Sequence, residues 1–288
     1  MGITISTLDY PEEIKNKLRD QFGSSIIFAE QESKDFTFFK IDFDQTKNFN
    51  TLEYLATIVA DIVIDKLEKK FINRIIKHKY NQFSVDEQGI IQEMTVDHLN
   101  ESLTPDRNLG KILRREEVIR QILRYFNQNQ DLNIEGFVRF RLKDYIDELK
   151  LAVEIAVDDF IIEKEYNEFI DLLKYFVNLQ EPRISVANVV QNKNGSFKIL
   201  DKMGNTINNE YLEGYLAEMF EDEVEYEDLL VSALINVAPV NIILHFDEPG
   251  TEDTVRKIFD ERVETCRGCE LCRKTSKASK VILDKKDE

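Results

Sequence analysis

Hydrophobic and polar residues follow two different periods along this chain, and the changes of period divide it into segments. Near the N-terminus, short apolar runs between polar turns predict strands at "ITIST", "SSIIFAE" and "FTFFKIDF". The stretch "PEEIKNKLRDQF" begins with Pro11, has acidic residues in its first turn and is followed by Gly23, which predicts a helix. Residues 1–48 are therefore predicted to form a small α/β unit.

From residue 49 to residue 182 the pattern is that of amphipathic helices. Apolar residues recur at every fourth position in one stretch: Val59, Val63, Leu67, Phe71 and Ile75. Ser84 and Glu87 have the spacing of a capping box, in which each side chain bonds the backbone N–H of the other residue. The stretch "NIEGFVRFRLKDYIDELKLAVEIAVDDFI" predicts one long helix, which "EYNEFIDLLKYFVNL" continues or turns back from. We expect a helical region here.

Beyond residue 182 the short strand patterns return. "RISVANVV" and "SFKIL" flank a polar segment that contains Asn194-Gly195, a dipeptide that predicts a β-hairpin. "PVNIILHF" predicts a further strand, and "NNEYLEGYLAEMF", "YEDLLVSALINVA" and "GTEDTVRKIFDERV" predict helices. Residues 183–272 thus hold the hairpin, helices, strand and a cysteine cluster, and residues 273–288 form a Lys-rich tail that we expect to be mobile.

Together these segments predict an α+β protein. Its core is mainly helical, with a small N-terminal α/β unit and a C-terminal part that contains a β-hairpin and one further strand. At 288 residues with 42% hydrophobic residues, the chain is long and apolar enough to bury a sizeable core.

The net charge and the length of the apolar runs limit the kinds of partner that this chain is expected to bind. The net charge of −17 disfavours nucleic-acid binding unless a local basic patch overrides it. The most apolar stretch, "LATIVADIVI", is broken by Asp61 and is too short for a membrane span. No signal-peptide pattern stands at the N-terminus, and the three cysteines are an odd number, so we predict a cytoplasmic protein.

The three cysteines, Cys266, Cys269 and Cys272, form a C-x2-C-x2-C run. Thiolates at this spacing can converge on one ion, and Gly268 permits the turn between them. Thiolate ligands predict zinc, or alternatively an iron–sulfur centre, although the fourth cysteine of a ferredoxin run is missing. A tetrahedral zinc ion needs a fourth ligand, for which we predict His245 at the end of "NIILH". Glu270 or a side chain of a partner are the alternatives.

Two interpretations of these cysteines need no metal. The first is three reduced thiols on a tight turn, and the second is a reversible disulfide between Cys266 and Cys269. The chain has no P-loop, no G-x-G-x-x-G after a strand, no G-x-S-x-G and no H-E-x-x-H. No catalytic residue is therefore identified, and whether the protein is an enzyme stays open.

Arg139 and Arg141 in "GFVRFRLKDY", together with the Lys-rich tail, are the candidates for a nucleic-acid surface. An amphipathic helix whose arginines cover the core and pair with the surplus carboxylates explains them better. Retention on DNA that depends on salt would favour the nucleic-acid interpretation.

Five stretches, in order along the chain, resemble the YtxC-like sporulation proteins: "NIEGFVRFRLKDYIDEL", "EKEYNEFIDLLKYFV", "QEPRI", "DLLVSALINVAP" and "RVETCRGCELC". The likeness covers most of the chain and is firmest from Asn133 to Cys272. It implies a cytosolic protein of spore-forming bacteria, and it implies no established reaction, cofactor or catalytic residue.

The resemblance and the missing catalytic motifs predict a sporulation-associated protein of unknown biochemical activity. We expect it to act through contacts with an unknown protein partner and to have a metal site at the cysteine cluster. The alternative is a redox or metal-dependent protein in which the thiols do chemistry, and a nucleic-acid binder ranks third. The sequence leaves the oligomeric state open.

Overall fold

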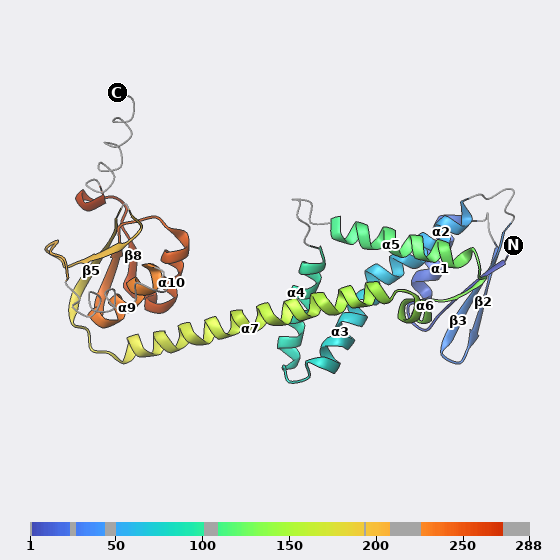
Figure 1. Ribbon diagram of the computed structural model, residues 1–288, viewed down its shortest axis with the longest axis horizontal. Coiled ribbons are helices and arrows are strands. Elements are labelled where there is room, and N and C mark those ends of the chain that lie inside the picture. The colour runs from blue at the N-terminus through green and yellow to red at the C-terminus, as the bar shows by residue number, and fades with distance from the viewer. Residues whose placement is uncertain are drawn as a thin grey trace, which may run out of the picture. The chain divides into compact units, whose positions relative to one another are not determined.

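The computed structural model describes residues 2–23, 27–43, 50–100, 109–192, 194–207 and 226–272. The chain forms two compact units, Met1–Glu163 (unit 1) and Lys164–Glu288 (unit 2). Each unit has a four-stranded sheet and a hydrophobic core of its own (Figure 1). The prediction of a mainly helical α+β protein is confirmed, whereas the division into four segments stays a prediction.

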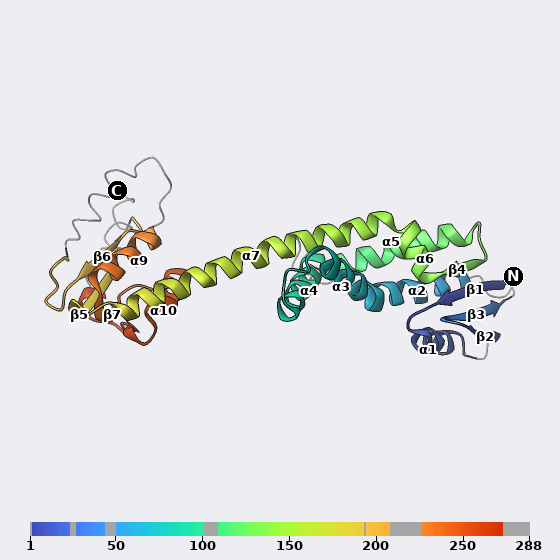
Figure 2. The same ribbon diagram turned by 90° about the horizontal axis from the view of Figure 1, so that it is seen from below.

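The sheet of unit 1 has the strand order β2-β3-β1-β4, antiparallel except for the parallel pair of β1 and β4. Its strands are β1 (Gly2–Thr7), β2 (Ile27–Ser33), β3 (Phe36–Asp42) and β4 (Asp131–Asn133). Helix α1 (Pro11–Phe22) begins at the predicted proline and ends at Gly23, whose φ of +54° suits glycine (Figure 2). The first three strands and α1 are the elements predicted for the N-terminal segment, and β4 completes their sheet.

The other helices of unit 1 are α2 (Thr51–Ile62), the π-helical turn η1 (Val63–Leu67), α3 (Glu68–Lys79), α4 (Val85–Asn100), α5 (Leu109–Phe126) and α6 (Ile134–Arg141). The capping box at the start of α4 is confirmed. The N–H of Ser84 donates to Glu87 Oε2 over 2.7 Å, and the N–H of Glu87 donates to Ser84 Oγ over 3.3 Å.

The prediction of one long helix that begins at Asn133 is wrong. Helix α6 ends at Arg141, and a new helix, α7 (Lys143–Leu179), begins after Leu142. The φ of −102° and ψ of +49° at Leu142 are not helical, and its side chain is buried in the core of unit 1. Helix α7 then continues through "EYNEFIDLLKYFVNL" without turning back.

A buried ion pair and the hydrogen bonds to it link four helices: α3, α4, α5 and α7. Glu68 on α3 and Arg114 on α5 are each 5% exposed. Arg114 donates from Nε and Nη2 to the two carboxylate oxygens of Glu68, over 3.1 and 3.3 Å. The hydroxyl of Tyr145 on α7 donates to Glu68 Oε2 over 2.9 Å, and burial raises the pKa of this hydroxyl, so it stays protonated. Arg114 also donates to the carbonyl of Leu99 at the end of α4.

The sheet of unit 2 has the strand order β6-β5-β7-β8. Its strands are β5 (Ile184–Gln191), β6 (Phe197–Leu200), β7 (Pro239–Leu244) and β8 (Val263–Thr265). The antiparallel pairing of β5 with β6 confirms the hairpin, and Gly195 in its turn has a φ of +85°. The described helices that pack on this sheet with the end of α7 are α9 (Tyr226–Val237) and α10 (Pro249–Phe259).

Strand β7 is the predicted further strand, and β8 is an additional one. The helix predicted over "GTEDTVRKIFDERV" ends at Phe259, earlier than its pattern indicated. Asp260, with a φ of +53°, ends the helix, a 3-10 turn follows, and Val263 enters the core as part of β8. The predicted helix "NNEYLEGYLAEMF" and the tail from residue 273 lie outside the described residues.

No described helix combines the length and apolar composition that crossing a membrane requires, in agreement with the sequence pattern.

Candidate metal centre

The sheet register of unit 2 brings His245 beside Cys266. Strands β5, β7 and β8 run parallel, and Leu244 at the end of β7 is paired with Thr265 at the end of β8. The next residue of each strand therefore lies at the same edge of the sheet. Two backbone bonds hold the pair there: the N–H of Cys266 donates to the carbonyl of Leu244, and the N–H of His245 donates to the carbonyl of Val189, each over 2.9 Å.

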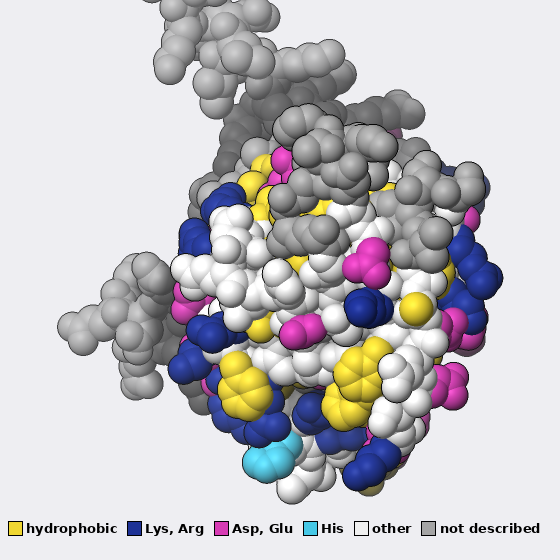
Figure 3. Space-filling model, turned by 90° about the vertical axis from the view of Figure 1, so that its right-hand side faces the viewer, with side chains coloured by type: hydrophobic (Ala, Val, Ile, Leu, Met, Phe, Trp, Pro, Cys, Tyr) yellow, Lys and Arg dark blue, Asp and Glu magenta, His cyan; other side chains and the backbone are white. Residues whose placement is uncertain are grey.

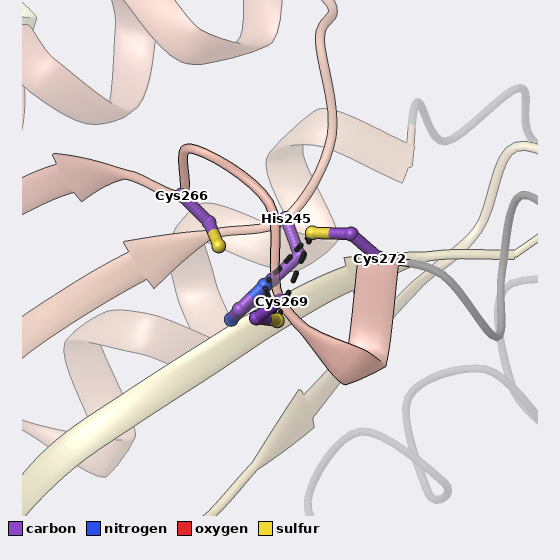
Figure 4. Close-up of side chains that lie close together, drawn as sticks. All are labelled: His245, Cys266, Cys269 and Cys272. Carbon is purple, nitrogen blue, oxygen red and sulfur yellow. Dashed lines mark hydrogen bonds between the residues drawn. The ribbon is translucent and has the colours of Figure 1, made fainter.

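The turn after β8 folds the other two cysteines back onto this edge (Figure 4). Gly268 adopts a φ of +119°, and its N–H donates to Cys266 Sγ over 3.4 Å. Cys272 Sγ lies 3.3 Å and Cys269 Sγ 3.4 Å from His245 Nδ1, and the two sulfurs are 3.9 Å apart. The nitrogen and the three sulfurs all lie within 4.8 Å of one another.

Asn188 of β5 determines which nitrogen of His245 faces the sulfurs as an acceptor. Its Nδ2 donates to the carbonyl of Asp201 over 3.1 Å, and a carbonyl can only accept. The amide oxygen Oδ1 is therefore turned to His245 Nε2, 3.0 Å away, so that Nε2 must carry the proton. His245 Nδ1 is left with its lone pair directed at the cysteines. An outer hydrogen bond of this kind is the usual companion of a metal-bound histidine.

The carbonyl that holds Asn188 is fixed in turn by a tight loop. Asp201 Oδ1 accepts the N–H groups of Met203 and Asn205, over 2.7 and 2.9 Å, and these bonds lower the pKa of the carboxyl, with Asn205 as the first cause. This series of hydrogen bonds, from the Asp201 loop through Asn188 to the imidazole of His245, is therefore formed without the cysteines.

The protonation of the cluster suits a cation. Burial lowers the pKa of His245, so its imidazole is neutral at pH 7. A hydrogen bond from the backbone of Cys272 lowers the pKa of the Cys269 thiol, whereas burial raises the pKa of the Cys272 thiol. The cluster holds no fixed positive charge, and each of its four side chains is half-buried. A divalent metal would complete the deprotonation of the thiols.

The separations fit a single tetrahedral zinc ion. Bonds of about 2.3 Å to sulfur and about 2.0–2.1 Å to nitrogen put a nitrogen about 3.6 Å from a sulfur and two sulfurs about 3.8 Å apart. The separations of 3.3, 3.4 and 3.9 Å among His245, Cys269 and Cys272 lie close to these values, and Cys266 Sγ lies within 4.8 Å of the other ligand atoms. An iron–sulfur cluster contains several irons, so its protein ligands stand further apart than those of one ion. The four residues therefore fit zinc better than a cluster.

All four residues predicted as a metal site from the sequence, Cys266, Cys269, Cys272 and His245, come together in the structure. Glu270, the alternative fourth ligand, is exposed and is not part of the group. No disulfide joins Cys266 to Cys269 in the structure.

The other basic candidates belong to unit 1. Arg139 and Arg141 are exposed at the end of α6, where Arg139 stacks on Phe140 and Arg141 on Tyr125, at 5.5 and 6.0 Å from the ring centres. The Lys-rich tail that was to accompany them lies outside the described residues.

The chain is similar to known proteins over most of its length. A profile of the YtxC-like family matches residues 53–264. The chain is 28% identical over 221 residues to "Uncharacterized protein YtxC" of Bacillus subtilis (strain 168), which covers 75% of this chain and 77% of that protein. No solved structure matches. The profile match includes Asn188 and His245 and ends before the three cysteines.

Proposed function

This chain belongs to the YtxC-like family, and from that premise we propose that it is a non-enzymatic contact protein whose unit 2 is held by a structural zinc ion. The ligands are His245 Nδ1 and the sulfurs of Cys266, Cys269 and Cys272. One observation supports this proposal above the others: a ring nitrogen of His245 and the three sulfurs lie within 4.8 Å of one another, and Nδ1 is 3.3 and 3.4 Å from two of these sulfurs.

The number of ligands favours a structural role over a catalytic one. Catalytic zinc sites have three protein ligands and leave one position open to water or substrate, whereas structural sites are closed by four. Here four side chains converge, and no fifth His, Cys, Asp or Glu in the described parts of the chain joins them. The zinc ion would fasten the end of β7, the end of β8 and the turn that follows to one another.

Elemental analysis of protein purified without oxygen tests this proposal. We expect about one zinc per chain and no absorbance in the visible, because Zn²⁺ has a filled d shell and four ligands complete its coordination. Iron in near-stoichiometric amount, with visible absorbance, would favour an iron–sulfur centre. Recovery of neither metal, together with three freely titratable thiols, would contradict the proposal.

The variant Asn188→Ala tests whether Asn188 orients His245 for zinc binding. Loss of the bond to Nε2 lets His245 rotate and change tautomer, so zinc affinity should fall roughly 10–100-fold in competition with a chelator. Asn192→Ala is the matched control, because its amide donates to the hydroxyl of Ser196 in the hairpin. Equal affinity in both variants would show that Asn188 does not position the ligand.

The link to sporulation, in the cytoplasm of a spore-forming bacterium, is part of this proposal and rests on the resemblance of five sequence stretches. A strain that lacks the gene should form fewer heat-resistant spores, while its growth before sporulation stays normal. Complementation with the intact gene is the control. Spore counts equal to those of the parent strain would contradict a sporulation role and leave the zinc site untouched.

A further inference from the structure

Helix α3 concentrates positive charge on the surface of an acidic protein. Between residues 66 and 79 the sequence has six Lys or Arg residues and one acidic residue, Glu68, in a chain of net charge −17. Glu68 is buried and is neutralised by Arg114, so it does not offset the cations on the surface. The exposed side of α3 is therefore a region of positive charge within unit 1.

The centre of this region has cations without carboxylate partners. Lys70, Arg74 and Lys77 are spaced four and three residues apart, so they share one face of α3. Lys70 pairs with Asp9, and Lys69 precedes Lys70 in the helix. We call these four basic residues the cationic strip. Within the described residues, no ion pair involves Lys69, Arg74 or Lys77. The sequence has 55 acidic residues and 38 basic ones, so a shortage of carboxylates does not explain why these cations lack partners.

The strip borders an open hollow of about 560 Å³, lined by Lys70, Asn73, Arg74, Lys77 and His78. None of these lining residues is acidic. The amide of Asn73 donates to Gln92 of α4 over 3.2 Å, so it is held in place beside the cations. Figure 3 shows Lys and Arg side chains gathered beside a histidine on the surface.

Carboxylates flank the strip. On one flank Lys66 pairs with Glu13 over 3.9 Å, and Lys70 pairs with Asp9. At the C-terminal end of α3, Lys79 pairs with Glu154 of α7. The unpaired cations Arg74 and Lys77 thus lie between Lys70 and Lys79, two lysines of α3 that are each paired with a carboxylate.

We propose that the cationic strip of α3 binds an acidic segment of a partner protein, one helix or one extended chain wide. A single helix, about 10 Å across, can contact the unpaired Arg74 and Lys77 where it crosses α3. A DNA duplex or an anionic membrane presents a broader negative surface, which would also meet Asp9, Glu13 and Glu154, the carboxylates paired with Lys70, Lys66 and Lys79. Like charges brought together in this way oppose binding. The carboxylates on either side of the unpaired cations therefore favour a narrow acidic partner.

The net negative charge of the whole chain does not prevent such a contact. At physiological ionic strength the Debye length is about 8 Å, so a segment seated on the strip is governed by the adjacent cations. The remote carboxylates slow the approach of an acidic partner more than they weaken the bound state. This inference concerns unit 1 and does not depend on the zinc site in unit 2.

Fluorescence anisotropy with a labelled peptide tests the proposal. The probe is a helical peptide of about 16 residues with Glu at every third or fourth position, and its twin has Gln in place of each Glu. We expect the full-length protein to bind the Glu peptide and not the Gln twin, with an affinity that falls as salt rises. The double variant Arg74→Gln, Lys77→Gln should bind roughly five- to thirtyfold more weakly.

The matched control removes two other exposed cations of unit 1, with Lys40→Gln and Lys143→Gln, and should bind like the unaltered protein. Thermal melts verify that both double variants remain folded. Equal weakening in the two variants would overturn the proposal, because only net charge would then matter. Tighter binding to a DNA duplex or to phosphatidylserine vesicles than to the Glu peptide, at the same salt, would also overturn it.

Discussion

Replacing Cys266, Cys269 and Cys272 together by serine is expected to abolish zinc binding and to loosen unit 2 from Val263 onward. Serine is a poor substitute for thiolate, so His245 alone would remain as a good ligand. Strand β8 pairs with β7 through three residues, and Cys269 and Cys272 in the turn after it contact His245 at the sheet edge. Unit 1 has its own core and should keep its fold.

Hydrogen exchange of the zinc-loaded protein and of the triple variant measures this difference residue by residue. Amides of residues 263–272 should lose protection, while those of α2, α3 and α5 stay as slow as before. Glu270→Gln is the matched control, since it lies in the same turn and outside the cluster. Global unfolding of the triple variant would show that the site is not peripheral. Unchanged exchange, with thiols that cycle between oxidised and reduced forms, would favour the redox alternative.

Arg114→Ala should destabilise unit 1 by about 3–5 kcal/mol, the range for breaking a buried ion pair. Removal of the guanidinium leaves the carboxylate of Glu68 buried without its ion-pair partner. Of the bonds that Arg114 and Tyr145 donate to this carboxylate, the one from the Tyr145 hydroxyl remains. The carbonyl of Leu99 also loses its donor. The pair joins α3, α4, α5 and α7, so the effect should reach all four helices.

Urea unfolding, followed through the exchange of α5 amides, reports on unit 1 separately from unit 2. Arg115→Ala is the control, because Arg115 is the next residue and its 2.7 Å bond to Asp61 lies at a half-exposed site. That change should cost no more than about 1 kcal/mol. A similar decrease in the free energy of unfolding in the two variants would mean that the buried Arg114–Glu68 pair contributes no more to stability than a half-exposed ion pair.

Local patterns predicted the elements that depend on local signals. The start of α1 depends on Pro11, the start of α4 on Ser84 with Glu87, and the β5–β6 hairpin on Asn194-Gly195. Each signal acts within a few residues, so the sequence alone displays it. The break at Leu142 and the early end of α10 depend instead on tertiary packing, which buries Leu142 and Val263 in the two cores. Apolar periodicity continues across both positions, and only tertiary packing interrupts the helix.

The candidate site divides in the same way. The cysteines are neighbours in the sequence, and His245 ends an obvious strand, so their types and spacing pointed to a metal. Asn188 was missed, because it is 57 residues from His245 and sits in a hairpin strand with no pattern that marks it. Its place beside the imidazole follows from the parallel register of β5 and β7, which strand patterns do not reveal. The same holds for β4 and β8, each three residues long.

The position of the cysteines along the chain also has a consequence for synthesis on the ribosome. They follow every other described element, so unit 1 and strands β5, β6 and β7 have been translated before Cys266 emerges. Chain growth at about 5–20 residues per second gives these parts time to fold first. His245 and Asn188 then already lie at the edge of a formed sheet, and β8 and the three cysteines after it are added last. In the proposed zinc protein, metal capture is thus a late, local event in the life of each new chain.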